Sequence, residues 1–307
     1  QRCPVLGGRV ESVDGSEAEA RSDVRRVINL GDRVAVVAEG YWAAKRGLDA
    51  TRIQWAYGEH GGLSSVGIDE QFRRDADSGQ AATVTDTGEA EAAFAEAART
   101  LEAEYEVPFL AHACMEPMNC TARVDGDTVE VWAPTQNQSD SVTAAAEAAG
   151  VAPERVTLHT TFLGGGFGRR SMTDFVSDAV AVARLVGAPV QVIWSREETT
   201  RHDGYRPAAY NRLSAAFDSE GKPTAWRHHI VAPSIMAANG MIGPEQRVDG
   251  SSVEAAKDVP YSLPAVRVDY TMSNTPVPLW WWRSVGNSQN GFIREHFADE
   301  VARAAGE

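Results

Sequence analysis

The sequence predicts an α+β fold divided into two domains, residues 1–105 and residues 106–307. Strand-like and helix-like segments alternate without the regular strand–helix–strand order of a doubly wound sheet. Two hairpin signals, Asp125-Gly126-Asp127 and Ser219-Glu220-Gly221-Lys222, join neighbouring strands. A length of 307 residues also favours two domains over one.

Short strands and helices are expected in the first domain. Alternating and β-branched patterns indicate strands at Arg9–Val13, Val24–Leu30, Arg33–Glu39 and Thr51–Tyr57. Ala-rich or amphipathic stretches predict helices at Ser16–Ser22, Tyr41–Ala50 and Gly88–Thr100. Weak periodicity with frequent Gly and Ser predicts a long loop over Gly58–Gln80.

The second domain contains more strands, and most of them are apolar. They are expected at Glu102–Val107, Cys120–Val124, Thr128–Ala133, Val156–Phe162, Val190–Ser195, Leu213–Asp218, Thr224–Val231 and Val266–Met272. Helices are expected at Asn137–Gly150, Ser171–Gly187 and Asn290–Ala305. The last helix should bury Phe292, Phe297 and Val301 along one stripe.

Composition excludes several classes of function. The net charge is −14, from 43 acidic and 29 basic residues, which disfavours nucleic acid and anionic membranes as partners. No apolar run approaches the length of a membrane span. Three cysteines cannot ligate an iron–sulfur cluster or a structural zinc. Cys114 and Cys120 are expected to be buried thiols, or a disulfide if the chain folds outside the cytosol.

A glycine-rich stretch, Leu163-Gly164-Gly165-Gly166-Phe167-Gly168-Arg169-Arg170, stands between an expected strand and an expected helix. Glycines reach positive φ and let main-chain N–H groups approach a ligand closely. The N-terminus of the following helix would favour an anion at the same place. The alternative is a tight turn without a ligand. The spacing fits neither a Walker A loop nor the dinucleotide fingerprint.

Three other polar segments are candidates for a site. His112 and Glu116 could act as acid and base, or could serve structural hydrogen bonds. After Pro134, Thr135 could cap a helix, and Gln136 offers an amide donor to an oxygen ligand. Next to Trp280-Trp281-Trp282, which cannot all point into one core, Arg283 could hold an anion through its guanidinium.

These motifs, taken in order, resemble those of the xanthine dehydrogenase and aldehyde oxidase family, the molybdenum hydroxylases. The matching stretches are Pro134-Thr135-Gln136-Asn137, Gly164-Gly165-Gly166-Phe167-Gly168 and Arg283-Ser284-Val285-Gly286-Asn287-Ser288-Gln289. Met115-Glu116-Pro117-Met118 and Trp281-Trp282-Arg283-Ser284-Val285-Gly286 are most similar to the isoquinoline 1-oxidoreductase β-subunit branch. The likeness covers nearly the whole chain.

This resemblance implies a domain order, a cofactor and a set of site residues. Residues 1–105 would be the C-terminal part of a hammerhead-type domain, and residues 106–307 a truncated first molybdopterin-binding domain. The cofactor would be a molybdenum-bearing molybdopterin in the cytosine dinucleotide form. Gln136 would correspond to the amide that hydrogen-bonds the oxo group of the metal. Gly164, Gly165, Gly166, Phe167 and Gly168 would place main chain beside the metal and pterin. Arg283 would lie beside the cofactor, and Arg206 would orient substrate.

The implied reaction is hydroxylation of an aldehyde or N-heterocyclic carbon with water as the oxygen source. Electrons would pass to a partner iron–sulfur subunit, and relatives of this type suggest a periplasmic location, with the cytoplasm as the alternative. Ser171 stands where purine-oxidising members carry a glutamate, which disfavours a purine substrate. The general-base glutamate is expected downstream of this chain. We therefore interpret the chain as a piece of a longer protein, and we expect this piece alone to be inactive. The competing hypothesis is a binding module that keeps the fold without the chemistry.

Overall fold

The computed structural model describes residues 1–307, which form two compact units. Unit 1 contains residues 1–62 and 112–204, and unit 2 contains residues 63–111 and 205–307. Each unit mixes helices with sheets that include antiparallel strands, in agreement with the α+β class. Each compact unit is assembled from two separate segments, whereas the predicted domains, residues 1–105 and 106–307, are each continuous in sequence. The predicted domain division therefore stays a prediction.

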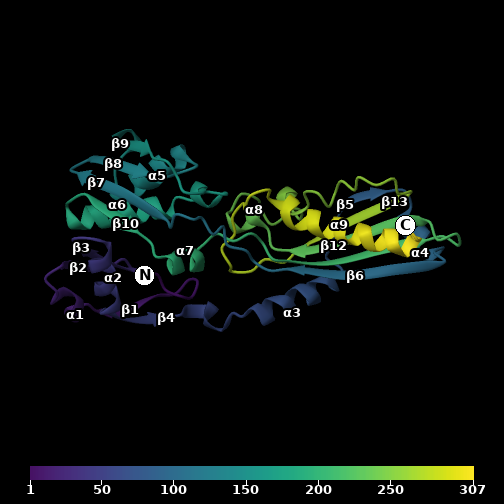
Figure 1. Cartoon of the computed structure of the whole chain (residues 1–307), viewed down its shortest axis with the longest axis horizontal. Helices are drawn as coiled ribbons and strands as arrows, with labels where there is room; N and C mark the ends of the chain where they lie inside the picture. The colour runs from purple at the N-terminus through teal and green to yellow at the C-terminus, as the bar shows by residue number, and fades with distance from the viewer. The chain divides into compact units, whose positions relative to one another are not determined.

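Unit 1 is built on a four-stranded sheet in the order β10-β7-β8-β9 (Figure 1). Its strands are β7 (Asn119–Asp125), β8 (Thr128–Ala133), β9 (Val156–Thr160) and β10 (Val190–Ile193). Strands β7 and β8 form the predicted hairpin, and β8 pairs with β9 in parallel. Helices α5 (Gln138–Ala149) and α6 (Asp174–Val186) pack on this sheet. Phe175 of α6 shares one hydrophobic core with Cys120 and Val131.

The first 62 residues add two small sheets to unit 1, β1 paired with β4 and β2 paired with β3. The elements are β1 (Arg9–Asp14), α1 (Ser16–Glu19), β2 (Val24–Asn29), β3 (Val34–Ala38), α2 (Tyr41–Asp49), β4 (Arg52–Ala56) and the 3-10 helix η1 (Gly58–Gly62). Later short elements of this unit are η2 (Pro153–Arg155), η3 (Arg169–Ser171) and α7 (Arg196–Arg201). Every strand and helix predicted before residue 58 is therefore present.

Unit 2 is built on a five-stranded sheet in the order β5-β13-β12-β11-β6. Its strands are β5 (Ala82–Thr87), β6 (Arg99–Val107), β11 (Ala209–Phe217), β12 (Pro223–Ala232) and β13 (Ala265–Met272). The predicted hairpin is present between β11 and β12. The helices are α3 (Ser65–Ala76), α4 (Ala90–Ala95), α8 (Ile235–Ala238), η4 (Gly250–Ser252) and α9 (Gly286–Ala305). Helix α9 lies along the sheet (Figure 1), with Phe297 packed edge-to-face on Trp226 at 4.8 Å.

The predicted loop over Gly58–Gln80 is wrong, because it contains helix α3. Ser64 caps this helix by accepting a hydrogen bond from the Gly67 amide. Ile68 and Phe72, four residues apart, are the buried residues of the helix. So few buried positions in 12 residues leave only a weak periodic signal in the sequence.

Two further predictions are wrong in part. The helix expected over Gly88–Thr100 ends at Ala95, and Arg99 and Thr100 instead belong to strand β6, where they pair with β11. In α9, Phe297 and Val301 are buried as predicted, but Phe292 is 54% exposed. None of the helices combines the length and the apolar character that crossing a bilayer requires.

Candidate cofactor site

The glycine turn, residues Gly164–Gly168, connects β9 to η3. Gly165 and Gly168 adopt φ values of 94° and 108°, and Phe167 adopts 55°, in a region that favours glycine. The Gly164 and Gly168 amides donate to side chains, whereas the amides of Gly165, Gly166 and Phe167 make no hydrogen bond within the chain. The turn therefore leaves three consecutive N–H donors for a ligand, the arrangement that forms anion-binding concavities elsewhere.

Gln136 lies directly beside this turn. Its side-chain Oε1 accepts a hydrogen bond from the Gly168 backbone amide at 3.1 Å. Its backbone N–H donates to the backbone carbonyl of Arg170 at 2.9 Å. A Cβ on Gly166 would lie 2.3 Å from Oε1, so Gln136 can approach only because residue 166 is glycine. With Oε1 bound, Nε2 has no partner in the chain and remains available as a donor.

The start of helix α6 does not serve a ligand in the way the sequence suggested. The helix begins at Asp174 rather than Ser171, because residues 169–171 form a 3-10 turn. The Asp174 carboxylate accepts from the Phe175 amide at 3.0 Å. The chain's own anion thus occupies this helix terminus, and the helix-dipole part of the prediction is wrong.

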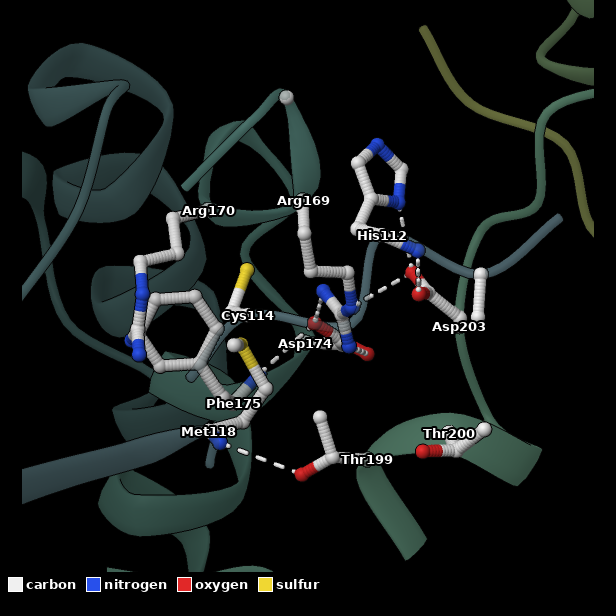
Figure 2. Close-up of polar contacts among 12 residues, drawn as sticks. His112, Cys114, Met118, Arg169, Arg170, Asp174, Phe175, Thr199, Thr200 and Asp203 are labelled. Carbon is white, nitrogen blue, oxygen red and sulfur yellow. Dashed lines mark hydrogen bonds and ion pairs between the residues drawn. The ribbon is translucent and has the colours of Figure 1, made fainter. Parts of the chain in front are cut away.

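Four polar side chains form a group directly after the turn (Figure 2): Arg169, Asp203 and His112 are buried, and Asp174 is partly exposed. Arg169 donates to both carboxylate oxygens of Asp174 at 2.9 and 2.8 Å, and its Nε lies 3.2 Å from Oδ1 of Asp203. Asp203 also accepts from the backbone amide of His112 at 2.6 Å and lies 2.9 Å from its Nδ1. Burial alone would raise the pKa of Asp174, but the Arg169 guanidinium holds it below its ordinary value. The two buried charges, Arg169 and Asp203, therefore each have an opposite partner, as their surroundings of low polarity require.

The remaining predicted site residues, Arg283 and Arg206, belong to unit 2. Arg283 is exposed, its side chain makes no hydrogen bond within the chain, and the next residues, Ser284 and Val285, adopt φ values of 68° and 51°. Arg206 donates to the carbonyl of Pro108 at 2.9 Å, and its buried Nε has no hydrogen-bond partner. Their roles beside cofactor and substrate stay predictions, as do those of Gln136 and the glycine turn.

Other sequence expectations are settled by the contacts. His112 and Glu116 both make structural hydrogen bonds, which is the second of the two interpretations. Thr135 does not cap helix α5, because Asn137 does so by accepting from the Asp140 amide. Trp280, Trp281 and Trp282 are all partly buried, and the first two pack edge-to-face at 5.1 Å.

The three cysteines are free and buried, so buried thiols are confirmed. Burial raises the pKa of Cys120 to about 12, which leaves this thiol unreactive near neutral pH.

Sequence reasoning did not identify Asp174 and Asp203 as partners of Arg169. The available signal was two adjacent arginines directly after the glycines, since charged side chains at a tight turn must find partners if the turn is packed. The partner at position 203 is distant in sequence and could not be identified from spacing.

The sequence also matches known proteins. The sequence model of the molybdopterin cofactor-binding domain family matches residues 74–307. The β subunit of isoquinoline 1-oxidoreductase from Brevundimonas diminuta is 28% identical over 318 residues, covering 98% of this chain and 40% of that protein. A membrane-bound aldehyde dehydrogenase (pyrroloquinoline-quinone) from Gluconacetobacter polyoxogenes is 30% identical over 315 residues, covering 96% of this chain and 40% of that protein. The chain thus spans about 40% of the length of these relatives.

Solved structures show the same fold. Aldehyde oxidoreductase from Desulfovibrio gigas superposes with a TM-score of 0.72 at 16% identity, covering 99% of this chain and 38% of that chain. Quinoline 2-oxidoreductase from Pseudomonas putida 86 also gives a TM-score of 0.72, at 18% identity, covering 100% of this chain and 44% of that chain. At these identities the comparison speaks for the fold alone.

Proposed function

Because this chain belongs to the molybdopterin cofactor-binding domain family, we propose that it supplies part of the cofactor site of a molybdenum hydroxylase. The reaction we propose is hydroxylation of an aldehyde or N-heterocyclic carbon, with water as the oxygen source. The names of two relatives, an isoquinoline oxidoreductase and an aldehyde dehydrogenase, support these two substrate classes.

The glycine turn is the observation that carries this proposal. The unpaired amides of Gly165, Gly166 and Phe167, together with Nε2 of Gln136, form a set of donors without acceptors in the chain. An oxygen-rich, anionic group fits such a set, because each donor would otherwise lack a partner when covered. The residues present therefore fit a metal-bearing pterin.

Each residue of the site has a stated task in this proposal. The turn amides would bind the cofactor, and Gln136 would donate a hydrogen bond through Nε2 to one of the cofactor's oxygens. Gly166 allows Gln136 to approach, since any side chain there would collide with its amide oxygen. When bound, the cofactor supplies Lewis acidity and two-electron redox chemistry. The general-base glutamate lies outside this chain in the proposal.

Several finer features follow from the family resemblance, and we propose them with it. Residues 1–105 would be the end of a hammerhead-type domain, and the cofactor would carry cytosine dinucleotide. Arg283 would face the cofactor, Arg206 would orient substrate, and an iron–sulfur subunit would receive the electrons. Without the general base and the rest of the cofactor site, the isolated chain would be inactive.

Gln136 provides the test. In the protein made from the complete reading frame, Gln136→Ala should lower kcat by about 10²- to 10³-fold, the cost of one donor to developing charge. Gln138→Ala is the matched control, because Gln138 is exposed and makes no side-chain hydrogen bond. Elemental analysis should find molybdenum in the wild-type protein. A protein without molybdenum would overturn the assignment and favour the binding-module alternative, whereas a protein that carries a quinone cofactor instead would overturn both.

A further inference from the structure

Glu116 joins the segment before β7 to the first glycine of the turn. Its Oε2 accepts from the Gly164 amide at 2.8 Å, and its Oε1 accepts from Nδ2 of Asn119 at 2.9 Å. Its own amide donates to the carbonyl of Gly164 at 3.0 Å. A Cβ on Gly164 would lie 2.5 Å from Cβ of Glu116, so this approach requires glycine at position 164.

Arg170 joins the other end of the turn to the same carboxylate. Its fully buried side chain donates through Nη2 to Oε2 of Glu116 at 2.8 Å and to the Glu116 carbonyl at 2.9 Å. Through Nε it donates to the carbonyl of Gly165 at 2.8 Å. The backbone carbonyl of Arg170 accepts a hydrogen bond from the backbone N–H of Gln136. One side chain and its backbone thus connect the segment of Glu116, the turn and the segment of Gln136.

These contacts decide which groups of the turn remain free. The N–H of Gly164 and the C=O of Gly165 are bound within the chain, and the next three amides are left without partners. Hydrogen bonds between charged groups are stronger than neutral ones. Glu116 is also the only carboxylate paired with Arg170, whose pKa is lowered by burial. Losing Glu116 would therefore leave a buried charge uncompensated and release the turn at the same time.

We propose that the Glu116–Arg170 pair is a positioning device that holds the glycine turn in its cofactor-accepting shape. Both residues act through the turn and through Gln136, and all their hydrogen bonds are made within the chain. The part of this inference that concerns the cofactor rests on the proposed function. The part that concerns the turn does not, and the two can be measured separately.

The experiment uses the protein made from the complete reading frame, with Glu116→Gln and Gly164→Ala as the test variants. Gly164→Ala keeps both charges and disturbs only the contact with Glu116. Matched controls are Glu147→Gln, at an exposed glutamate of α5, and Gly62→Ala, at a glycine where an added Cβ would meet nothing within 4 Å. Two quantities are measured: residue-resolved hydrogen–deuterium exchange of the Gly164 and Gly168 amides, and molybdenum content by elemental analysis.

In both test variants, exchange at the amide of residue 164, which loses a hydrogen bond to a carboxylate, should rise by about 10- to 100-fold, and exchange at the Gly168 amide, which bonds the neutral Gln136, should rise by up to about 10-fold. Exchange in β7, β8 and α6 should stay unchanged, and molybdenum content should fall. Neither control should alter either quantity. Test variants with wild-type turn exchange and wild-type molybdenum would overturn the inference.

A double variant separates positioning from simple compensation of charge. Glu116→Gln with Arg170→Met removes both charges, so the free energy of unfolding should recover relative to Glu116→Gln alone. If the pair positions the turn, exchange at Gly164 and Gly168 should remain fast in this variant. Recovery of slow exchange would overturn the inference. A wild-type protein without molybdenum would overturn the proposed function alone, and the exchange data would still decide the role of the pair.

Discussion

Arg169 is the residue whose loss should destabilise unit 1 most directly. It is fully buried, and its guanidinium contacts the carboxylates of Asp174 and Asp203. Arg169→Met would leave the buried Asp203 without its counter-ion, so we expect the free energy of unfolding to fall by about 3–5 kcal/mol. Chemical denaturation followed by circular dichroism measures this change.

Arg184 on helix α6 is the matched control for that measurement. It is exposed, and the only hydrogen bond of its side chain is a 3.5 Å contact with the Ala148 carbonyl. Arg184→Met should change the free energy of unfolding by less than about 1 kcal/mol. Equal losses in the two variants would show that the buried charge network contributes nothing particular to stability.

At this scale, the sequence indicates some site residues much better than others. Glycine runs and a strand-end amide carry a local signal, so Gly164–Gly168 and Gln136 could be singled out from the chain alone. The local pattern indicates Glu116 as a polar candidate but not its partner, and it does not indicate Asp203 at all, because the partners lie 48 and 34 positions away along the chain: Gly164 for Glu116, and Arg169 for Asp203. Only the structure shows that the carboxylate of Glu116 accepts a hydrogen bond from the first amide of the turn.

Helix α9 allows a prediction at the scale of one element. Phe297 is fully buried against Trp226, whereas Phe292 on the same helix is 54% exposed. Phe297→Ala should lower the free energy of unfolding by about 3–5 kcal/mol, because it removes an aromatic side chain from a packed core. Phe292→Ala should cost less than about 1 kcal/mol. Denaturant titration of both variants checks this, and similar losses would contradict the burial assigned to the helix.

The elements themselves could be predicted where local pattern and tertiary packing agree. Hairpins with Gly-containing turns, such as β7–β8, and Ala-rich helices ended by glycine, such as α5, fall in this group. The prediction is wrong where pairing overrides propensity: Arg99 and Thr100 follow a helix-forming run but pair with Phe217 and Ala216 of β11. Helix α3 lies where the sequence predicts a loop. Only Ile68 and Phe72 of this helix are buried, so its apolar face is too narrow to give a clear periodic pattern in the sequence.

At the scale of the whole molecule, the order of motifs along the chain does not follow the order of compact units. Gln136 and the glycine turn lie in unit 1, while Arg206 and Arg283 lie in unit 2. The chain passes from unit 1 to unit 2 near residue 62, returns near residue 112 and leaves again near residue 204. Periodicity and spacing report only local structure, so they do not indicate to which compact unit each motif belongs.

Unit 2 should lose stability in acid because of His228 on β12. This side chain is fully buried, its Nε2 lies 2.9 Å from Oδ1 of Asn211, and its Nδ1 has no partner. Burial, with a smaller contribution from His229, lowers its pKa from 6.5 to about 3. Between these two pH values the unfolded chain binds a proton that the folded chain does not. The free energy of unfolding should therefore fall as pH decreases through this range, by up to about 1.4 kcal/mol per pH unit.

His228→Gln tests this prediction, because glutamine can still bond Asn211 but does not titrate. Denaturant unfolding at pH 7 and pH 5 should show a smaller pH dependence in His228→Gln than in the wild-type chain. His159→Gln is the control, since His159 lies in unit 1 with 44% of its side chain exposed. This control should keep the wild-type dependence for the unfolding of unit 2. If His228→Gln keeps it as well, the acid sensitivity of unit 2 must come from other groups, such as its carboxylates or His229, whose pKa burial also lowers, and not from His228.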